Sequence, residues 1–281
     1  MSTLEKTLTS IRPVVLRTQG HRGGPVTRLM SPSDLGEVLR PFVFLDYFDT
    51  QGPVKSDSLN MHPHSGIATV TWILEGSVNY VDTSGETGEL PQGGMEWMQA
   101  GGGAWHGGKF GEAGRVRGFQ LWVALPPDNE LGAAESVYLP PDAIDHNGPA
   151  AVLLGHYGTA NSPIRTPSPI TYLAVKLKAG ERWRFQPPEG QTVAWAAVGK
   201  GHLSAPESLH SGVLAVFDES TDAIDFHAEV DTEFVLGSAV KHSHNLVLGH
   251  YSVHTSAAAL REGEERIGRI GRQLREAGRL A

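Results

Sequence analysis

Two histidines separated by one residue are the sharpest chemical signal in this sequence. His62 and His64 stand on either side of Pro63, directly before an apolar run that is typical of a strand. Residues i and i+2 of an extended chain project to the same face, so both imidazoles can be aimed at one point. A single histidine on an apolar strand is usually a core residue, but this pair, next to a glycine turn, favours a metal site. The third ligand must come from elsewhere in the fold. His106 is the candidate, because the glycine-rich turn before it lets the backbone approach closely.

The composition leaves imidazole and carboxylate to hold such a metal. The 281-residue chain has 13 histidines and no cysteine, which excludes disulfides, iron–sulfur clusters, cysteine-ligated zinc and thiolate nucleophiles. Its net charge of −8 argues against a broad surface for nucleic acid or an anionic membrane, and we expect neither as a partner. A chain of this length holds one large domain or two of about 140 residues each.

The elements that must position these histidines are strands. Glycine and proline are abundant, with 34 and 18 residues, which favours many turns over a helical bundle. Short runs of β-branched and aromatic residues bounded by glycine recur along the chain and predict an all-β fold, either sandwich or barrel. We expect strands at 67–74, 78–82, 119–125, 170–177, 193–198, 213–217 and 234–236.

A faint internal repeat divides the chain into two halves. The segment 73–78 is a strand that breaks at Gly76, and the segment 196–202, which contains Gly199 and Gly201, falls in the corresponding place about 123 residues later. The repeat predicts two β-barrels joined across the proline- and glycine-rich stretch 126–149. One large sandwich is the alternative, and periodicity alone does not separate the two.

The two ends of the chain depart from this strand pattern. From Ser256, which can cap a helix, leucine and isoleucine at 260, 267, 270 and 274 share one helical stripe with Gly263 and Ala277. We therefore predict a C-terminal helix that docks on the barrels. The first ten residues are polar and lack the apolar core of a secretory leader, and no run is long enough for a membrane span. A cytoplasmic location is expected.

Several stretches of the sequence resemble the pirin family of bicupins. They are HPHSGIATVTWILEGSVNYVDTSG, LPQGGMEWMQAGGGAWHGG and RGFQLWVALP in the first half, and SPIRTPSPITYLAVKLKAGERWRFQPPEG in the second. The resemblance covers most of the chain and implies two cupin, jelly-roll-like β-barrels in tandem. We expect an N-terminal cupin domain at 1–135, a C-terminal cupin domain at 136–255, and a helix at 256–281 packed on the barrels.

The resemblance also implies one metal, commonly iron, in the N-terminal domain. Carried over to this sequence, the family's histidine ligands are His62, His64 and His106, whereas its glutamate ligand falls on Gly108. A second family glutamate, expected on the same strand face as the second histidine, falls on Ala68. Three imidazoles are therefore predicted to hold the metal, and zinc, nickel or copper also suits such a site. A divalent ion among neutral ligands keeps a charge of +2, which favours an anionic ligand.

The implied reaction depends on a base that the sequence does not identify. Some pirins resemble quercetin 2,3-dioxygenases, which implies a metal-dependent dioxygenase acting on a small phenolic or flavonol-like substrate. Such a reaction needs a group that accepts the substrate's hydroxyl proton, and neither Ala68 nor Gly108 provides one. Glu75, Glu96 and Glu112 are candidates to replace it, although Glu75 and Glu96 are expected at solvated strand positions.

Two other functions remain open beside the enzyme. Loss of the base suits a non-catalytic binding or regulatory protein, since some pirins contact protein partners, and a degenerate cupin without metal is the third hypothesis. Trp97 and Trp105 flank the site and are candidates for the aromatic wall of a substrate pocket, with ordinary core positions as the alternative.

A second group of histidines lies near the C-terminus. His242 and His244 repeat the i, i+2 spacing, and His250 and His254 follow. The resemblance assigns no metal to this half of the chain. We therefore expect exposed loop histidines here rather than a second metal site.

Overall fold

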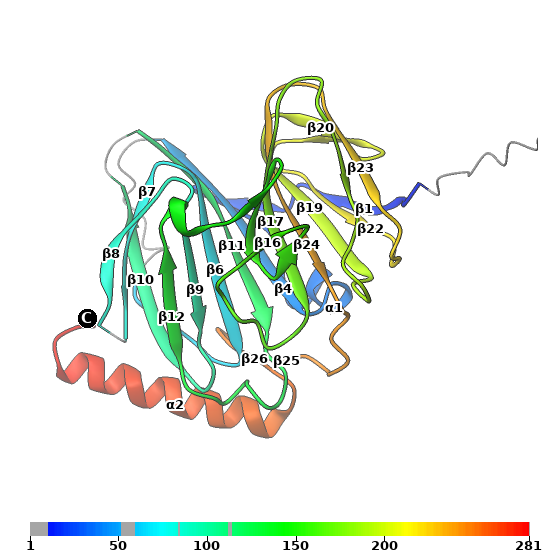
Figure 1. Cartoon of the computed structure of the whole chain (residues 1–281). Coiled ribbons are helices and arrows are strands. Elements are labelled where there is room, and N and C mark those ends of the chain that lie inside the picture. Colours follow the sequence, from blue (N-terminus) through cyan, green and yellow to red (C-terminus); the bar gives the residue numbers. More distant parts are fainter. Residues whose placement is uncertain (1–10, 52–59, 84, 112–113, 281) are drawn as a thin grey trace, which may run out of the picture.

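The computed structural model describes residues 11–51, 60–83, 85–111 and 114–280. Two β-units lie side by side, and one long C-terminal helix runs beneath the N-terminal unit (Figure 1). The predicted fold class, an all-β tandem bicupin with a C-terminal helix, is confirmed.

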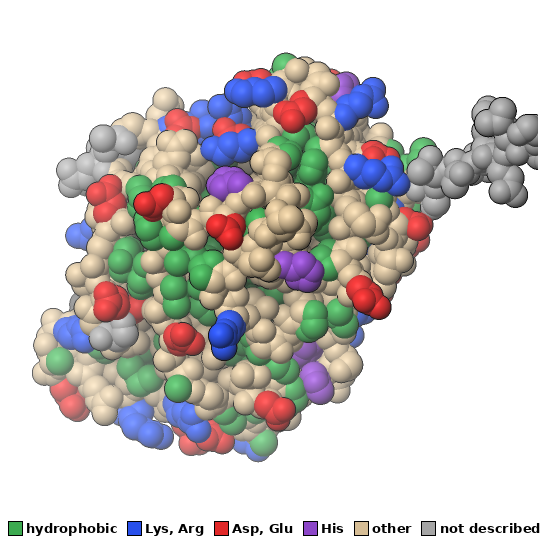
Figure 2. All heavy atoms as spheres, viewed as in Figure 1, with side chains coloured by type: hydrophobic (Ala, Val, Ile, Leu, Met, Phe, Trp, Pro, Cys, Tyr) green, Lys and Arg blue, Asp and Glu red, His purple; other side chains and the backbone are tan. Residues whose placement is uncertain are grey.

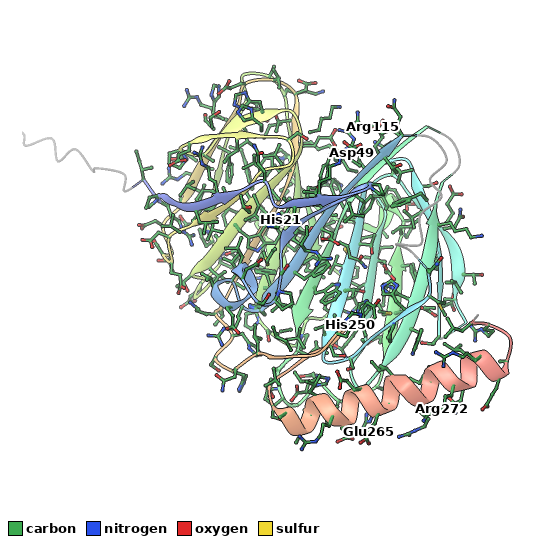
Figure 3. All side chains as sticks on the ribbon, turned by 180° about the vertical axis from the view of Figure 1, so that it is seen from behind. His21, Asp49, Arg115, His250, Glu265 and Arg272 are labelled. Carbon is green, nitrogen blue, oxygen red and sulfur yellow. The ribbon has the colours of Figure 1, made fainter. Side chains whose placement is uncertain are left out.

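The N-terminal unit consists of a seven-stranded sheet that faces a four-stranded sheet. Its strands are β2 (His21–Gly23), β3 (Val26–Met30), β4 (Phe42–Gln51), β5 (His62–His64), β6 (Ile67–Glu75), β7 (Ser77–Asp82), β8 (Thr87–Pro91), β9 (Met95–Gln99), β10 (Ala104–Phe110), β11 (Arg115–Ala124) and β12 (Glu135–Leu139), with the short helix α1 (Leu35–Val38) before β4. The large sheet has the order β12-β9-β6-β11-β4-β3-β2, and the small sheet has the order β5-β10-β7-β8. At the rim of this unit Arg115 of β11 donates two hydrogen bonds to Asp49 of β4, at 2.7 and 2.6 Å (Figure 3).

The C-terminal unit repeats this arrangement. Its strands are β1 (Val14–Thr18), β13 (His146–Asn147), β14 (Ala150–Leu154), β17 (Ile170–Leu177), β18 (Arg182–Phe185), β19 (Val193–Lys200), β20 (His202–Ser204), β21 (Ser208–His210), β22 (Leu214–Phe217), β23 (Ile224–Ala228) and β24 (Thr232–Ala239). The large sheet has the order β1-β22-β19-β24-β17-β14-β13, and the small sheet has the order β18-β23-β20-β21. Smaller elements complete the chain: the 3-10 helix η2 (Pro141–Ala143) and the strand pairs β15 (His156–Tyr157) with β16 (Ala160–Asn161) and β25 (Val247–Leu248) with β26 (Val253–His254).

The two segments of the internal repeat occupy corresponding places in the two units. Gly76 joins β6 of a large sheet to β7 of a small sheet, and Gly201 joins β19 to β20 in the same way. Both have a positive φ, +78° and +88°, a backbone conformation that favours glycine. The repeat in the sequence therefore follows a repeated turn in the fold.

The strands of the two units interleave along the chain. Although β1 comes from the first 135 residues, it pairs with β22 of the C-terminal unit, and β12 begins at the predicted limit of 135 but belongs to the N-terminal sheet. Near the end of the chain, Ser252 forms a bridge with Ser65 of the N-terminal unit. Domain limits at single positions such as 135 and 255 therefore do not assign every strand to its unit.

The two large sheets face each other across the main hydrophobic core. Even-numbered residues of β6, such as Ala68 and Trp72, join Trp97 of β9 on one side, and Tyr172 and Trp195 lie on the other. These five side chains are at most 5% exposed. The core therefore binds the two units into one body.

The interiors of the two units differ. A second core fills the C-terminal unit and includes Phe185, Phe217, Phe226 and Phe234. In the N-terminal unit the odd-numbered residues of β6 face inward, and the interior there contains a cavity and the predicted histidines. The cavity that adjoins the predicted histidines thus lies in the N-terminal unit.

The C-terminal helix α2 (Ala257–Glu276) begins where the sequence predicts. The hydroxyl of Ser256 accepts a hydrogen bond from the N–H of Ala259 at 3.2 Å and caps the first turn. The helix buries Ala259, Gly263, Ile267, Gly271 and Leu274 against the N-terminal unit. Glu265 and Arg272 project from the opposite side into solvent (Figure 3).

The surface carries charges of both signs. Acidic and basic side chains are interspersed on the face shown in Figure 2, without a large area of one sign. Among the helices of the described residues, none is both long and apolar enough to cross a membrane.

Candidate metal centre and adjoining cavity

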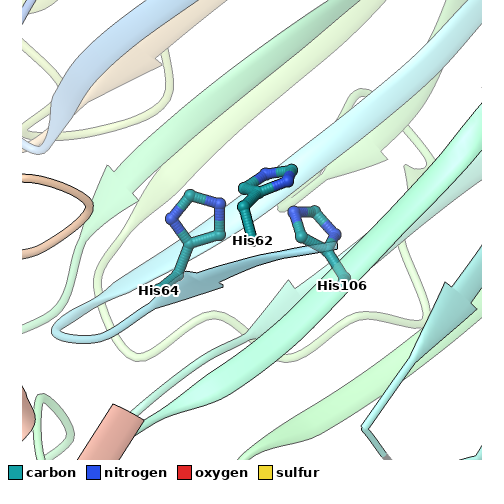
Figure 4. A group of neighbouring side chains, drawn as sticks. All are labelled: His62, His64 and His106. Carbon is teal, nitrogen blue, oxygen red and sulfur yellow. The ribbon is translucent and has the colours of Figure 1, made fainter. Parts of the chain in front are cut away.

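Three imidazoles meet where β5 pairs with β10. His62 lies opposite His106 in this antiparallel register, and His64 lies two pairs further along, opposite Ala104. The ring centroids are 4.7 to 5.1 Å apart, and one nitrogen of each ring lies within 4.8 Å of the other two (Figure 4). The structure therefore brings together the three histidines that the sequence singled out.

A hydrogen bond at Nδ1 fixes the orientation of each imidazole. The partners are the carbonyl of Asn60 for His62 at 2.7 Å, the carbonyl of Tyr251 for His64 at 3.0 Å, and the carboxylate of Glu96 for His106 at 3.0 Å. Because these oxygens only accept, Nδ1–H donates in each case and Nε2 keeps a free lone pair. The Nε2 atoms of His64 and His106 are buried without a hydrogen-bond partner among the described residues.

His62 and His64 are also kept neutral by their surroundings. Burial, with the nearby His106, lowers the pKa of His62 to about 4 and that of His64 well below its ordinary value. Neutral imidazoles with an unsatisfied, buried nitrogen are ligands for a divalent transition metal. The donor set therefore fits the metal that the sequence led us to expect.

Glu96 lies at this site rather than in solvent, which corrects the prediction of a solvated strand position. It is 6% exposed, and one carboxylate oxygen accepts from His106 while the other accepts from Thr71 at 2.6 Å. Burial acts to raise the pKa of Glu96, but the attraction of His106 and the hydrogen bonds from His106 and Thr71 outweigh it and lower the pKa. Thr71, one of two threonines in the otherwise apolar run 67–74, was the signal in the sequence for this inward-facing polar pair.

A second carboxylate candidate, Glu75, does not lie at the histidines. Glu75 ends β6 and accepts a hydrogen bond from Arg117 at 2.9 Å, with 39% of its side chain exposed. Glu112 lies outside the described residues.

The two positions without a family carboxylate have different surroundings. The prediction that position 68 shares a strand face with His64 is wrong. The chain turns between the two residues, and Ala68 packs in the core between the units. Gly108 does line the cavity, but a Cβ atom there would lie 2.3 Å from the carbonyl oxygen of Asn79. A side chain at 108 would therefore require β7 to move.

A cavity of about 400 Å³ opens beside His62 and His106. One wall is a row of polar residues at the same level of the large sheet, which we call the polar belt: His21, Arg28, Asp46, Gln120, Thr71 and Glu96. Each is the direct cross-strand partner of the next, from β2 to β9. Directly opposed residues of antiparallel strands point to the same face, so the register alone aligns the belt.

The rest of the cavity lining is apolar and partly aromatic. Its side chains are Phe48, Val78, Tyr80, Leu90 and Phe110, with Val26 at the edge. A molecule in this cavity would therefore meet apolar rings, the hydrogen-bonding groups of the belt, and imidazoles at one end.

Neither tryptophan predicted as an aromatic wall lines this cavity. Trp97 is 2% exposed and packs in the core between the two units, because it points to the opposite face of β9 from Glu96. Trp105 packs on α2, and its indole N–H donates to the carbonyl of Ile267 at 2.9 Å. Both follow the alternative that the sequence left open, ordinary core positions.

The histidines near the C-terminus are not all exposed, contrary to the prediction. His244 and His250 are exposed, but His242 and His254 are 6% and 1% exposed. His254 lies beneath α2, hydrogen-bonded to Glu130 at 3.0 Å.

Comparison with known proteins places this geometry in context. Residues 24–123 match the family model described as Pirin. A pirin-like protein from Caulobacter vibrioides is 31% identical over 243 residues, which cover 80% of this chain and 86% of that protein.

Solved structures share the same architecture. The quercetin 2,3-dioxygenase from Acinetobacter baumannii superposes with a TM-score of 0.82 at 25% identity, covering 92% of this chain and 98% of its own. The bacterial pirin YhhW from Escherichia coli, solved in complex with nickel(II), superposes with a TM-score of 0.64 at 19% identity, covering 82% of this chain and 98% of its own.

Proposed function

The chain belongs to the pirin family, and from this premise we propose that it is a metal-dependent dioxygenase acting on a small phenolic, flavonol-like molecule. The observation that carries the proposal is the convergence of His62, His64 and His106 at one end of a 400 Å³ cavity. Their free Nε2 atoms would hold one divalent transition metal. Iron is the first candidate by family resemblance, and nickel is present in the related pirin structure.

The charge of the centre favours a phenolate over a neutral phenol. Three neutral imidazoles leave a divalent ion with its full charge, and the nearest carboxylate, Glu96, stands behind His106 rather than on the ion. When bound, the ion would supply Lewis-acid stabilisation of a substrate oxygen. The three imidazoles would hold that ion at one end of the cavity.

The cavity walls orient a planar molecule. Phe48 and Phe110 offer apolar surface to an aromatic ring, and burial of the ring removes water from it. On the polar belt, the side-chain amide of Gln120 makes no hydrogen bond among the described residues. It can therefore bind a substrate hydroxyl or carbonyl.

In the part of the chain that the structure describes, no free carboxylate stands beside the imidazoles to act as the base. Asp46 is engaged by Arg28, and both oxygens of Glu96 already accept hydrogen bonds. We infer that the substrate hydroxyl loses its proton to solvent on entry and is held as the phenolate. This inference replaces the side-chain base that the sequence failed to supply.

Metal analysis of protein purified without a histidine tag tests the proposal. We expect close to one transition-metal ion per chain in the wild type and none in His62→Ala/His64→Ala. The matched control is His202→Ala/His210→Ala, which removes another pair of neighbouring histidines, with rings 4.2 Å apart, from the exposed β20–β21 hairpin. The control is expected to keep its metal.

Oxygen uptake separates the enzyme from a binding protein. Metal-loaded wild type is expected to consume oxygen when given quercetin, and His62→Ala/His64→Ala is not. Stoichiometric metal without oxygen uptake under any metal would reject the dioxygenase for this substrate and favour the non-catalytic binding protein. Wild type that binds no metal would reject the whole proposal.

A further inference from the structure

A chain of buried polar groups lies between the metal centre and α2. The hydroxyl of Ser65 lies 3.0 Å from Nε2 of His254, and Nδ1 of His254 lies 3.0 Å from the carboxylate of Glu130. The three residues are 0%, 1% and 3% exposed. They come from the turn after β5, from β26, and from the turn after β11, so three distant parts of the sequence meet here.

Further hydrogen bonds complete this network. The carboxylate of Glu130 accepts from the N–H of Thr255 at 2.7 Å and from its hydroxyl at 2.6 Å. The hydroxyls of Ser65 and Ser252 are hydrogen-bonded at 2.8 Å. Because a carboxylate only accepts, Nδ1–H of His254 donates to Glu130, and Nε2 faces the Ser65 hydroxyl.

The order of groups, serine, histidine and glutamate, is the one that activates a nucleophilic serine, but access excludes that role here. Gly263 of α2 packs directly on the network, and a Cβ atom at this position would lie 2.5 Å from both Nε2 of His254 and Oγ of Ser65. No acyl group can reach the serine hydroxyl under the helix. The network must act on the structure around it.

The residue next to this network is a histidine of the metal centre. Ser65 directly follows His64, and its carbonyl accepts from the N–H of Val253 at 3.3 Å. The carbonyl of Tyr251 in the same C-terminal segment accepts from Nδ1–H of His64 at 3.0 Å. The segment 251–254 thus holds both the backbone after His64 and its imidazole ring.

We propose that Ser65, His254 and Glu130 form a positioning network that aims Nε2 of His64 at the metal. The C-terminal segment, which follows the whole second unit in the sequence, thereby completes the metal centre of the first. This inference rests on the proposed function in one respect, that His64 is a metal ligand. Ser65 and Glu130 are positioning residues, since neither reaches the metal centre itself.

Cobalt(II) binding to the metal-free, full-length protein tests the inference. Ser65→Ala removes the hydroxyl that faces His254, and Glu130→Gln removes the negative charge that holds Nδ1–H of His254. Loss of a direct hydrogen-bond partner of a metal ligand weakens metal binding by about 10- to 100-fold, and because Ser65 and Glu130 act on His64 through the segment 251–254, we expect a loss at the lower end of this range. We expect this weakening in both variants, by competition with a chelator, together with a shifted visible cobalt(II) spectrum, which reports the ligand geometry.

The matched control is Ser238→Ala in the C-terminal unit. Ser238 is also 0% exposed, and its hydroxyl has no hydrogen-bond partner among the described residues, so cobalt(II) affinity and spectrum are expected to match the wild type. Thermal unfolding of each metal-free variant shows whether that variant is folded. If one of the two network variants is not folded, the cobalt(II) affinity and spectrum of the other decide the test.

The outcomes separate this inference from the proposed function. Folded network variants with wild-type cobalt(II) affinity and spectrum would overturn the positioning role. If the variant His62→Ala/His64→Ala binds cobalt(II) as tightly as the wild type does, the metal centre itself is rejected, and the inference with it.

Discussion

At the scale of single residues, one displaced carboxylate distinguishes this centre. The family resemblance puts a glutamate at position 108, on the metal, where this chain has glycine. The structure instead puts the carboxylate of Glu96 behind His106, at 3.0 Å from Nδ1. A carboxylate in this position fixes the ring and makes Nε2 a stronger ligand. In the proposed metal centre the negative charge would thus stay near the three imidazoles, while position 108 would supply no ligand.

Replacing Glu96 by glutamine tests this role. Glu96→Gln keeps an oxygen acceptor for His106 and removes the charge, so we expect metal affinity to fall by about tenfold. Chelator competition measures it. The control is Thr71→Val, which removes the other hydrogen bond to Glu96 but leaves the charge, and a smaller loss is expected. Equal affinity of Glu96→Gln and wild type would show that the charge has no part in metal binding.

At the scale of elements, the helix α2 is fitted to strand β10 by a small residue. A Cβ atom at Gly271 would lie 2.6 Å from the indole ring of Trp105, whose N–H is bonded to the carbonyl of Ile267. At Gly268, on the same helix, the nearest heavy atom would be 3.8 Å away, on Arg272. The contact with Trp105 thus requires glycine at position 271, whereas position 268 has room for a side chain.

The two glycines therefore respond in opposite ways to the same substitution. We expect Gly268→Ala to raise the free energy of unfolding by about 1 kcal/mol, because alanine favours the helix. Gly271→Ala is expected to lower it by about 1–3 kcal/mol, since the methyl group displaces Trp105. Urea denaturation at one pH measures both. Equal stabilisation by the two substitutions would contradict the fitted contact.

At the scale of the whole molecule, the two units share one fold but differ in their interiors. The interior of the C-terminal unit is closed by packed phenylalanines, whereas the interior of the N-terminal unit keeps a cavity and neutral, buried histidines. The two units share the core between their large sheets, so each supports the other. Burial of uncharged histidines makes the stability of this assembly depend on pH.

Four buried histidines have a lowered pKa, in each case first through burial: His62, His64, His242 and His254. In the unfolded chain their pKa is about 6.5, so below this pH the unfolded state binds more protons than the folded state. Above about pH 7 these histidines therefore do not lower the free energy of unfolding of the metal-free protein. It is expected to fall between pH 6.5 and 4, by up to about 1.4 kcal/mol per histidine for each pH unit.

Urea denaturation of the metal-free protein from pH 7.5 to 4.5 measures this decline. The control variant is His242→Leu, since both ring nitrogens of His242 are buried without a partner among the described residues. Removing one of the four titrating groups should make the decline shallower. A free energy of unfolding that stays constant from pH 7.5 to 5.5 would contradict the prediction.

The sequence by itself determined what depends on local pattern. The predicted strand at 170–177 coincides with β17, and Ser256 caps the predicted helix. The spacing of His62 and His64 on an extended chain was sufficient to pair them, because side chains alternate with a period of two. The glycine-rich turn before His106 made it the candidate for the third ligand, and the family resemblance pointed to the same residue.

Only the tertiary structure decided which face each strand turns toward the cavity. Glu96 and Trp97 are neighbours in the sequence, yet one lies at the metal centre and the other in the core between the units. The polar belt and the network of Ser65, His254 and Glu130 join residues up to 189 positions apart. Strand register and helix docking create these contacts through long-range packing, and no local pattern of residue types encodes them.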